Sequence, residues 1–233
     1  MIRRGLRKTE DFFMEHGAPS GGERGRFVTF EGGDGVGKST QVRLLAKKLT
    51  DLGLKVKITR EPGGDEVGEK IRAVLKSSPG LDPLCEVLLL FAARRENFIR
   101  RVLPPLEEGR WVVCDRFYDS SLVYQGILKG ISGEDIMLLK RLVMGDFEPD
   151  LTIVLDMAAE TSAKRLSERN SSDEYDGMNI ERHQQIRKGF QKIAEIFSFR
   201  AALVKADGSE AAVASRIWKI LEKRLGSFLI SSP

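Results

Sequence analysis

The sequence has little of the chemistry that disulfides and soft-metal sites require. Its 233 residues include two cysteines and two histidines, too few for a disulfide framework or a four-ligand zinc site. Cys85 falls in an expected helix and Cys114 in an expected buried strand, which disfavours a bond between them. No apolar run approaches the roughly 20 residues of a membrane-spanning helix. We therefore expect no membrane association.

Neither sign of charge is in large excess. Lysine and arginine number 38 against 34 acidic residues, a net charge of +4. The sequence also has no stretch in which basic and aromatic residues are clustered, so we expect no nucleic-acid partner.

The first 25 residues differ from the rest of the chain. They are basic at first and then rich in Gly, Pro and Ser, without periodicity. The basic residues suit a targeting peptide, but Glu10, Asp11 and Glu15 do not, and the apolar core of a secretory signal is missing. We expect a disordered extension or start-site artefact over 1–25, with a targeting peptide as the alternative. Residues 26–233 are then a single cytoplasmic domain.

Beyond the extension, short apolar runs alternate with longer amphipathic stretches. The runs predict strands at Phe27–Glu31, Lys55–Thr59, Trp111–Asp115, Leu151–Asp156 and Ala201–Lys205. The amphipathic stretches predict helices at about 38–52, 84–106, 160–169, 180–199 and 210–225, the second ended by Pro104 and Pro105. This alternation predicts an α/β fold: a doubly wound, five-stranded parallel sheet with helices on both faces.

The turn after the first strand fits the pattern G-x-x-x-x-G-K-[ST], which is typical of phosphate-binding loops. Glycines allow successive backbone N–H groups to surround a phosphate, and the next helix directs its positive end at the same anion. Lys38 would reach the β- and γ-phosphates, and Ser39 would ligate Mg²⁺. The predicted ATP-binding residues are Gly32, Gly33, Asp34, Gly35, Val36, Gly37, Lys38, Ser39, Thr40 and Arg165.

A phosphate-binding loop alone leaves kinases, GTPases and ATPases open. The Asn-Lys-x-Asp signature of GTPases does not occur. Arginines are prominent instead, and two of them, Arg60 and Arg116, directly follow predicted strands, where open α/β sheets bind ligands. A kinase needs such cations because its donor and acceptor phosphates repel each other.

Five segments in order resemble the signature segments of bacterial thymidylate kinases. They are Glu31–Thr40, Thr59–Gly64, Phe91–Arg94, Asp115–Gly126 and Gly145–Asp156. The resemblance extends from about Phe27 to the end of the chain. It implies transfer of the γ-phosphate of ATP to dTMP in dTTP synthesis.

The resemblance also implies roles for residues around the phosphates. Asp115 and Asp156 both end predicted strands, and the pattern alone does not choose between them as the carboxylate that holds Mg²⁺ through water; the resemblance favours Asp115. Arg116 would bind the acceptor phosphate, and Arg60 would contact phosphate or substrate. The predicted catalytic residues are Lys38, Asp115, Arg116 and Arg169.

The nucleoside pocket is implied in the same way. Asp34 corresponds to an acid near the 3′-hydroxyl and would pair with Arg116, and Arg94 would hydrogen-bond thymine. Tyr124 would exclude a ribose 2′-hydroxyl. Further positions lining the pocket are Ser120 and Gln125. In the family a Phe that stacks on the base lies four residues before the arginine; this position is Leu90 here, and we expect Phe91 to substitute.

Residues 167–179 are polar and correspond to a lid over ATP. No arginine occurs among residues 33–36, so the resemblance is to kinases whose catalytic arginine comes from the lid, here Arg169, with Arg165 one turn earlier. The family has an Asp-Arg pair later in the lid, and this pair reads Asp173-Glu174 here, so an acid replaces the second lid arginine. ATP should therefore bind less tightly or depend wholly on Arg169. The resemblance further implies a loop beside adenine at Lys205–Ser209 and a homodimer formed through apolar faces of 84–106 and 136–143.

Two alternatives remain open from sequence. The chain could phosphorylate another nucleoside monophosphate or a deoxynucleoside, or it could be a P-loop ATPase that switches between partners.

Overall fold

The computed structural model describes residues 24–168 and 179–229. Arg169, Asp173, Glu174 and most of the predicted lid lie outside the described residues, as do residues 1–23. Arg24 and Gly25, assigned from sequence to the extension, belong to the folded part. Arg24 makes two hydrogen bonds to Asp150, at 2.8 and 2.9 Å, and the Gly25 N–H donates to the Leu106 carbonyl.

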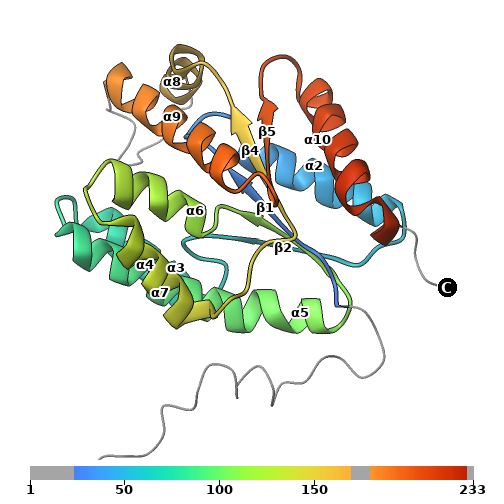
Figure 1. Ribbon diagram of the computed structural model, residues 1–233, viewed down its shortest axis with the longest axis horizontal. Coiled ribbons are helices and arrows are strands. Elements are labelled where there is room, and N and C mark those ends of the chain that lie inside the picture. Colours follow the sequence, from blue (N-terminus) through green and yellow to red (C-terminus); the bar gives the residue numbers. More distant parts are fainter. Residues whose placement is uncertain (1–23, 169–178, 230–233) are drawn as a thin grey trace, which may run out of the picture.

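The molecule is built on a five-stranded parallel sheet (Figure 1). Its strands are β1 (Phe27–Glu31), β2 (Val56–Arg60), β3 (Trp111–Asp115), β4 (Leu151–Asp156) and β5 (Ala201–Lys205). They lie in the order β2-β3-β1-β4-β5, and every pair is parallel. The predicted α/β fold is confirmed, and the order reverses direction at β1, which places the carboxyl end of β1 at a switch point where ligands bind.

Helices cover both faces of the sheet, because the central strands are apolar on both sides. Val28 and Phe30 of β1 join the core beneath α2 (Lys38–Asp51) and α10 (Glu210–Leu225). Phe27 points to the opposite face. That face is covered by α4 (Pro83–Asn97), α5 (Leu103–Glu107), α6 (Tyr118–Ser121), α7 (Gly133–Met144) and α9 (Ile180–Ile196), with α3 (Glu66–Ser77) and α8 (Ala159–Ser167) beyond them.

The helical stretch that begins near residue 84 is not ended by its prolines. A π-helical segment, η1 (Phe98–Val102), links α4 to α5, and Pro104 and Pro105 lie in the first turn of α5. Proline is tolerated there because its missing N–H would have no helical partner. Helical structure ends at Glu107, one residue from the predicted end, but the prediction that the two prolines end it was wrong.

Helices α3 and α7 were not predicted. Both begin at side-chain caps: Asp65 accepts from two backbone N–H groups of α3, and Ser132 accepts from one of α7. A second π-helical segment, η2 (Leu122–Ile127), follows α6, and a short 3-10 turn, η3 (Gly226–Phe228), follows α10. Within the described residues, no helix has the length and apolar character needed to cross a bilayer.

Candidate active site

The predicted phosphate-binding loop connects β1 to α2. Two of its glycines are sterically required, because a Cβ would lie 2.6 Å from the Leu155 carbonyl oxygen at Gly32 and 2.5 Å from the Ser162 carbonyl oxygen at Gly35. Both also have positive φ, which favours glycine. The loop is therefore held against the carboxyl end of β4 and against α8.

Lys38 folds back over this loop. Its Nζ donates to the carbonyl oxygens of Gly32, at 2.9 Å, and Gly33, at 2.6 Å, and lies 4.0 Å from Asp34. Burial, followed by the nearby Arg116 charge, lowers the pKa of Lys38 to about 8. A phosphate anion bound here would favour the charged form of Lys38.

Ser39 and Asp115 lie in contact beside the loop. The Ser39 hydroxyl donates to the Asp115 carboxylate at 2.5 Å. Asp156, the alternative from sequence, is occupied by a bidentate contact with Arg187 at 2.7 and 2.9 Å. No group of three or more acidic, histidine or cysteine side chains suited to a metal occurs in the described residues. A hydroxyl and one carboxylate next to a phosphate site still fit Mg²⁺, which takes few protein ligands and completes its shell with water and phosphate oxygens.

Arg116 lies at the carboxyl end of β3 in a left-handed backbone conformation, with φ of 71°. Such a conformation is uncommon outside glycine and costs on the order of 1–3 kcal/mol in sparsely populated regions. It directs the guanidinium toward the phosphate-binding loop, where Nη2 contacts the Asp34 carboxylate and Nη1 donates to Ser120 Oγ at 3.0 Å. A strained backbone that presents a cation to the phosphate-binding loop indicates a functional position.

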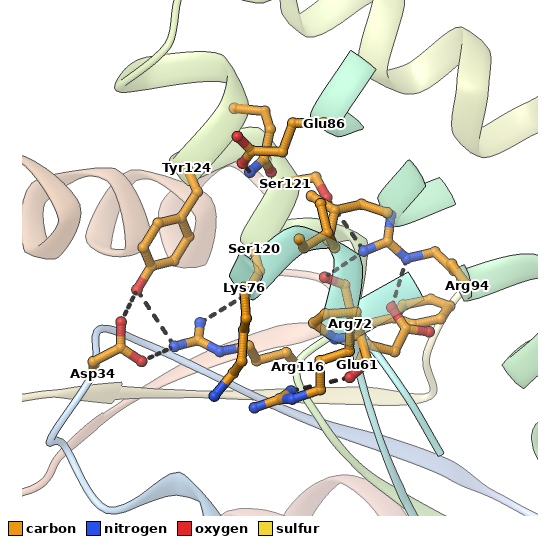
Figure 2. A pocket seen from close by; sticks show the side chains of 15 residues that line it. Asp34, Glu61, Arg72, Lys76, Glu86, Arg94, Arg116, Ser120, Ser121 and Tyr124 are labelled. Carbon is orange, nitrogen blue, oxygen red and sulfur yellow. Dashed lines mark hydrogen bonds and ion pairs between the residues drawn. The ribbon is translucent and has the colours of Figure 1, made fainter. Parts of the chain in front are cut away.

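The Asp34 carboxylate is held ionised. Burial by itself would raise its pKa, but the charges of Arg116 and Lys38 and a hydrogen bond from Tyr124, at 2.9 Å, hold the pKa well below its usual range. Tyr124, Asp34 and Arg116 therefore form one connected group at the edge of the loop, which Figure 2 shows on one side of a pocket.

Glu31, the last residue of β1, anchors the segment that follows Arg116. It is fully buried and accepts hydrogen bonds from the Phe117 backbone N–H, at 2.7 Å, and from Ser120 Oγ, at 2.6 Å. Burial, followed by the charge of Asp119, raises the pKa of Glu31 to about 8. Glu31 was not among the predicted site residues.

A pocket of about 180 Å³ opens next to this group (Figure 2). Its lining combines cations, acids and apolar side chains from α3, α4, α6, η2, the phosphate-binding loop and the turns after β2 and β3, namely Asp34, Glu61, Pro62, Arg72, Leu75, Lys76, Glu86, Leu90, Arg94, Arg116, Phe117, Ser120, Ser121, Tyr124 and Gln125. We call it the acceptor pocket, because it adjoins the phosphate-binding loop through Asp34 and Arg116.

Arg94 is the most deeply buried cation of the acceptor pocket, with 3% of its surface exposed. Its Nε donates to Glu61 at 2.6 Å, and Nη2 donates to Ser121 Oγ at 3.2 Å. Its Nη1 has no hydrogen-bond partner among the described residues. A buried donor without a partner is costly, so this N–H group indicates a ligand acceptor.

A second pocket, of about 260 Å³, lies on the other side of the loop. It is lined by Val36, Gly37, Thr40, Gln41, Arg165, Glu168, Ala206, Gly208, Glu210 and Val213. The structure thus brings Thr40 and Arg165 together with the predicted adenine loop at 205–209. Two pockets that share one phosphate-binding loop suit a donor nucleotide and an acceptor.

Comparisons with known proteins agree with this arrangement. The family model described as thymidylate kinase matches residues 30–217. The thymidylate kinases of Rhodopseudomonas palustris (strain TIE-1) and Bradyrhizobium sp. (strain ORS 278) are each 42% identical over 87% of this chain, covering 90% and 92% of their own lengths. The crystal structure of thymidylate kinase from Ehrlichia chaffeensis matches with a TM-score of 0.70 and 32% identity, over 85% of this chain and 99% of its own.

This chain belongs to the thymidylate kinase family.

Two residues predicted from the resemblance to thymidylate kinases lie elsewhere than expected. The Phe91 ring is buried in the core, 4.4 Å beneath the Arg94 guanidinium, and Leu90 lines the acceptor pocket instead. A base cannot stack on Phe91 in this geometry. Arg60 is exposed and paired with Glu69 at 2.9 Å, and it does not line the pocket.

Gln125 lines the pocket, as predicted. Its Nε2 donates to Glu86 at 2.6 Å, and Glu86 also pairs with Lys129. One of its two N–H groups is therefore bound to Glu86.

Arg72 and Lys76 of α3 also line the acceptor pocket and were missed from sequence. They lie four residues apart and so share one face of the helix. Their signal was available, because Asp65 followed by an acidic first turn is typical of a helix start, and predicting α3 would have placed both cations on one side.

Proposed function

We propose that this chain is an ATP-dependent kinase that transfers the γ-phosphate of ATP to dTMP, giving dTDP and ADP. The observation that supports this most directly is the acceptor pocket itself, with Arg116 beside the phosphate-binding loop and the unpartnered Nη1 of Arg94 buried in its wall. A nucleoside monophosphate offers a phosphate for the first cation and a base carbonyl for the second.

The transfer needs no covalent enzyme intermediate. An oxygen of the acceptor phosphate attacks the γ-phosphorus, and the bond from that phosphorus to the β–γ bridging oxygen breaks, releasing ADP. Lys38 and Arg116 would neutralise the charge of the donor and acceptor phosphates, and their fixed positions supply alignment. No general base is required, because the attacking oxygen is already anionic.

We assign the metal ligands to Ser39 and Asp115, which face each other at the start of α2. Mg²⁺ bound there would lower the charge on the β- and γ-phosphate oxygens. Asp34 would accept from the 3′-hydroxyl of the acceptor while it pairs with Arg116. Tyr124, donating to Asp34, would occupy the space of a ribose 2′-hydroxyl.

From the sequence we predict that Arg169 supplies the catalytic cation of the lid. Arg165, one helical turn earlier, lines the second pocket. Replacing Arg169 by Ala should lower kcat by a factor of 10³ or more, on the order of what arginine fingers supply. Glu174→Arg restores a cation and should tighten ATP binding.

We further propose a homodimer and a cytoplasmic location. Exposed leucines lie on neighbouring helices α4 and α7 and would be covered by a second copy. Cys85 and Cys114 are both unpaired, as is usual in a reducing compartment.

The test is a coupled assay of ADP release from ATP and Mg²⁺ with dTMP, dUMP, dGMP, dCMP, UMP and thymidine as acceptors. We expect turnover with dTMP far above the others. Preferred turnover of another acceptor would make the chain a kinase for that compound. Slow hydrolysis that no acceptor stimulates would identify an ATPase switch instead, an alternative that membership of the family does not favour.

A further inference from the structure

One wall of the acceptor pocket is formed by residues 116–125, which we call the acceptor wall. It includes Arg116, Ser120 and Tyr124, and it comprises α6 and the first part of η2. One side of this wall lines the acceptor pocket. Its buried side is bound by Arg200, a residue in the turn between α9 and β5 that lines neither of the two pockets.

Arg200 makes a fork-shaped contact with Asp119 of the acceptor wall. Nη1 donates to Oδ2 at 2.8 Å and Nη2 to Oδ1 at 2.7 Å. Arg200 is 2% exposed and Asp119 is fully buried. A bidentate pair in such an environment fixes the orientation of both groups more strongly than an exposed pair does.

The same guanidinium reaches three further groups. Nη2 donates to the Tyr118 hydroxyl at 2.6 Å, Nη1 donates to Thr152 Oγ1 of β4 at 2.9 Å, and Nε lies 3.0 Å from Glu148. Arg200 therefore connects two consecutive residues of the wall, Tyr118 and Asp119, to the central sheet. Since α6 is one turn long, fixing these two residues fixes the direction in which the next side chain, Ser120, points.

Electrostatics gives the pair a second effect. Asp119 and Glu31 are both fully buried, and the charge of Asp119 contributes to the raised pKa of Glu31. Arg200 pairs with Asp119, and Glu31 accepts from Ser120 and from the Phe117 N–H. Ser120 in turn accepts from Arg116, so the chain of contacts ends at the cation facing the acceptor phosphate.

We propose that Arg200 is a positioning residue for the acceptor: by binding Asp119 and Tyr118 from behind, it sets the orientation of Arg116, Ser120 and Tyr124 without touching either substrate. The proposal rests on the proposed function of the pocket. It predicts an effect on dTMP that is separate from any effect on ATP, because neither Arg200 nor Asp119 contacts the phosphate-binding loop or the second pocket.

The test compares Arg200→Lys with Arg24→Lys. Lysine keeps a buried positive charge opposite Asp119, but it loses the fork and the ties to Tyr118 and Thr152. Arg24, which precedes β1, is the control: it makes a bidentate contact of the same kind with Asp150, directly before β4, but in an exposed place and outside the lining of both pockets. Asp119→Asn disrupts the same ion pair by removing the charge of Asp119. This variant serves as the test if Arg200→Lys does not fold.

The measurements are KM for dTMP, KM for ATP, kcat, and the melting-temperature shift produced by dTMP and by ADP. For Arg200→Lys and Asp119→Asn we expect KM for dTMP to rise by about tenfold or more, the dTMP-induced shift to shrink, and KM for ATP and the ADP-induced shift to stay within about twofold. Arg24→Lys should leave all of these unchanged.

Two results would overturn the proposal. One is a wild-type KM for dTMP in both variants. The other is a loss of melting temperature and of kcat with both KM values unchanged, as a purely structural role predicts. Failure of the proposed function is distinguishable, since it would appear as the absence of dTMP-dependent turnover in the wild-type protein.

Discussion

Burial of charged groups around the phosphate-binding loop couples the chemistry of single residues to pH. Lys38 and Glu31 lie at the two ends of the loop, and both have a pKa of about 8. The ordinary pKa of lysine, 10.5, is higher than this, and that of glutamate, 4.5, is lower. Burial is the largest cause for each, and it disfavours the charged form in both cases. The two groups therefore affect different properties as pH rises: Lys38 affects nucleotide binding, and Glu31 affects the stability of the fold.

For Lys38 the expected consequence is weaker nucleotide binding at high pH. Below pH 8 the ammonium group is charged and binds a triphosphate without proton uptake; above it, binding must first protonate the amine. We expect Kd for a non-hydrolysable ATP analogue to begin to rise near pH 8 and to approach a tenfold rise per pH unit well above it. Isothermal titration calorimetry measures this. Lys38→Met should bind more weakly and without that slope; an equal slope in the variant would exclude Lys38 as its source.

For Glu31 the expected consequence is a loss of stability as pH rises. Its pKa is about 8 in the folded state against an ordinary value of 4.5, so between these values the folded state holds a proton that the unfolded state has released. This contribution is complete below about pH 4.5 and is lost as pH rises through about 8, by up to ~1.4 kcal/mol per pH unit.

Urea unfolding of Glu31→Gln between about pH 5 and 8 tests this expectation. The amide cannot titrate, so its free energy of unfolding should depend less steeply on pH than that of the wild type. Glu134→Gln, an exposed change on α7, should keep the wild-type slope. Parallel slopes for Glu31→Gln and wild type would show that Glu31 does not titrate in this range.

At the scale of elements, α4 and α7 present an apolar surface that the sequence pattern alone could not assign. Both helices bury one side in the core beneath β1 and β3. Their other sides expose Leu84 and Leu88 on α4 and Leu138 and Leu142 on α7, the last two at 64% and 70%. Neighbouring helices with adjoining exposed leucines favour an interface, since scattered single residues would need no explanation.

We expect the double substitution Leu138→Glu and Leu142→Glu to separate the proposed dimer. In a twofold interface each change occurs twice, so the dimer Kd should rise by at least about 100-fold. Sedimentation velocity measures the mass. Leu203→Glu, on a leucine of β5 that is 46% exposed, is the control and should leave the dimer intact. A wild-type monomer, or a double variant that remains dimeric, would refute this interface.

At the scale of the whole molecule, the strand order decides where chemistry takes place. Parallel strands bring their carboxyl ends to one edge, and the register pairs Phe30 and Arg60 with Asp115. The loop after β1 and the turn after β3 thereby meet between the two pockets. Residues 82 positions apart in the chain, Asp34 and Arg116, become direct partners.

The sequence by itself determined the sheet, the phosphate-binding loop and the family, because these depend on local patterns: apolar runs of strand length, glycines where a Cβ would clash, and motifs of fixed spacing. It also predicted the pairing of Asp34 with Arg116. The pattern alone did not distinguish Asp115 from Asp156 and the resemblance favoured Asp115; the tertiary structure adds that Arg187 occupies the Asp156 carboxylate.

Other assignments depended on which side of a helix meets the sheet. Phe91 and Leu90 are adjacent in sequence, yet the rotation of α4 sends the first into the core and the second into the pocket. Arg60, Arg72 and Arg200 show the same limit, since the contacts of an arginine depend on long-range neighbours such as Glu69 and Asp119. Burial and partnership are properties of the packed molecule, so the tertiary structure alone decided which cations face a ligand and which hold the wall behind it.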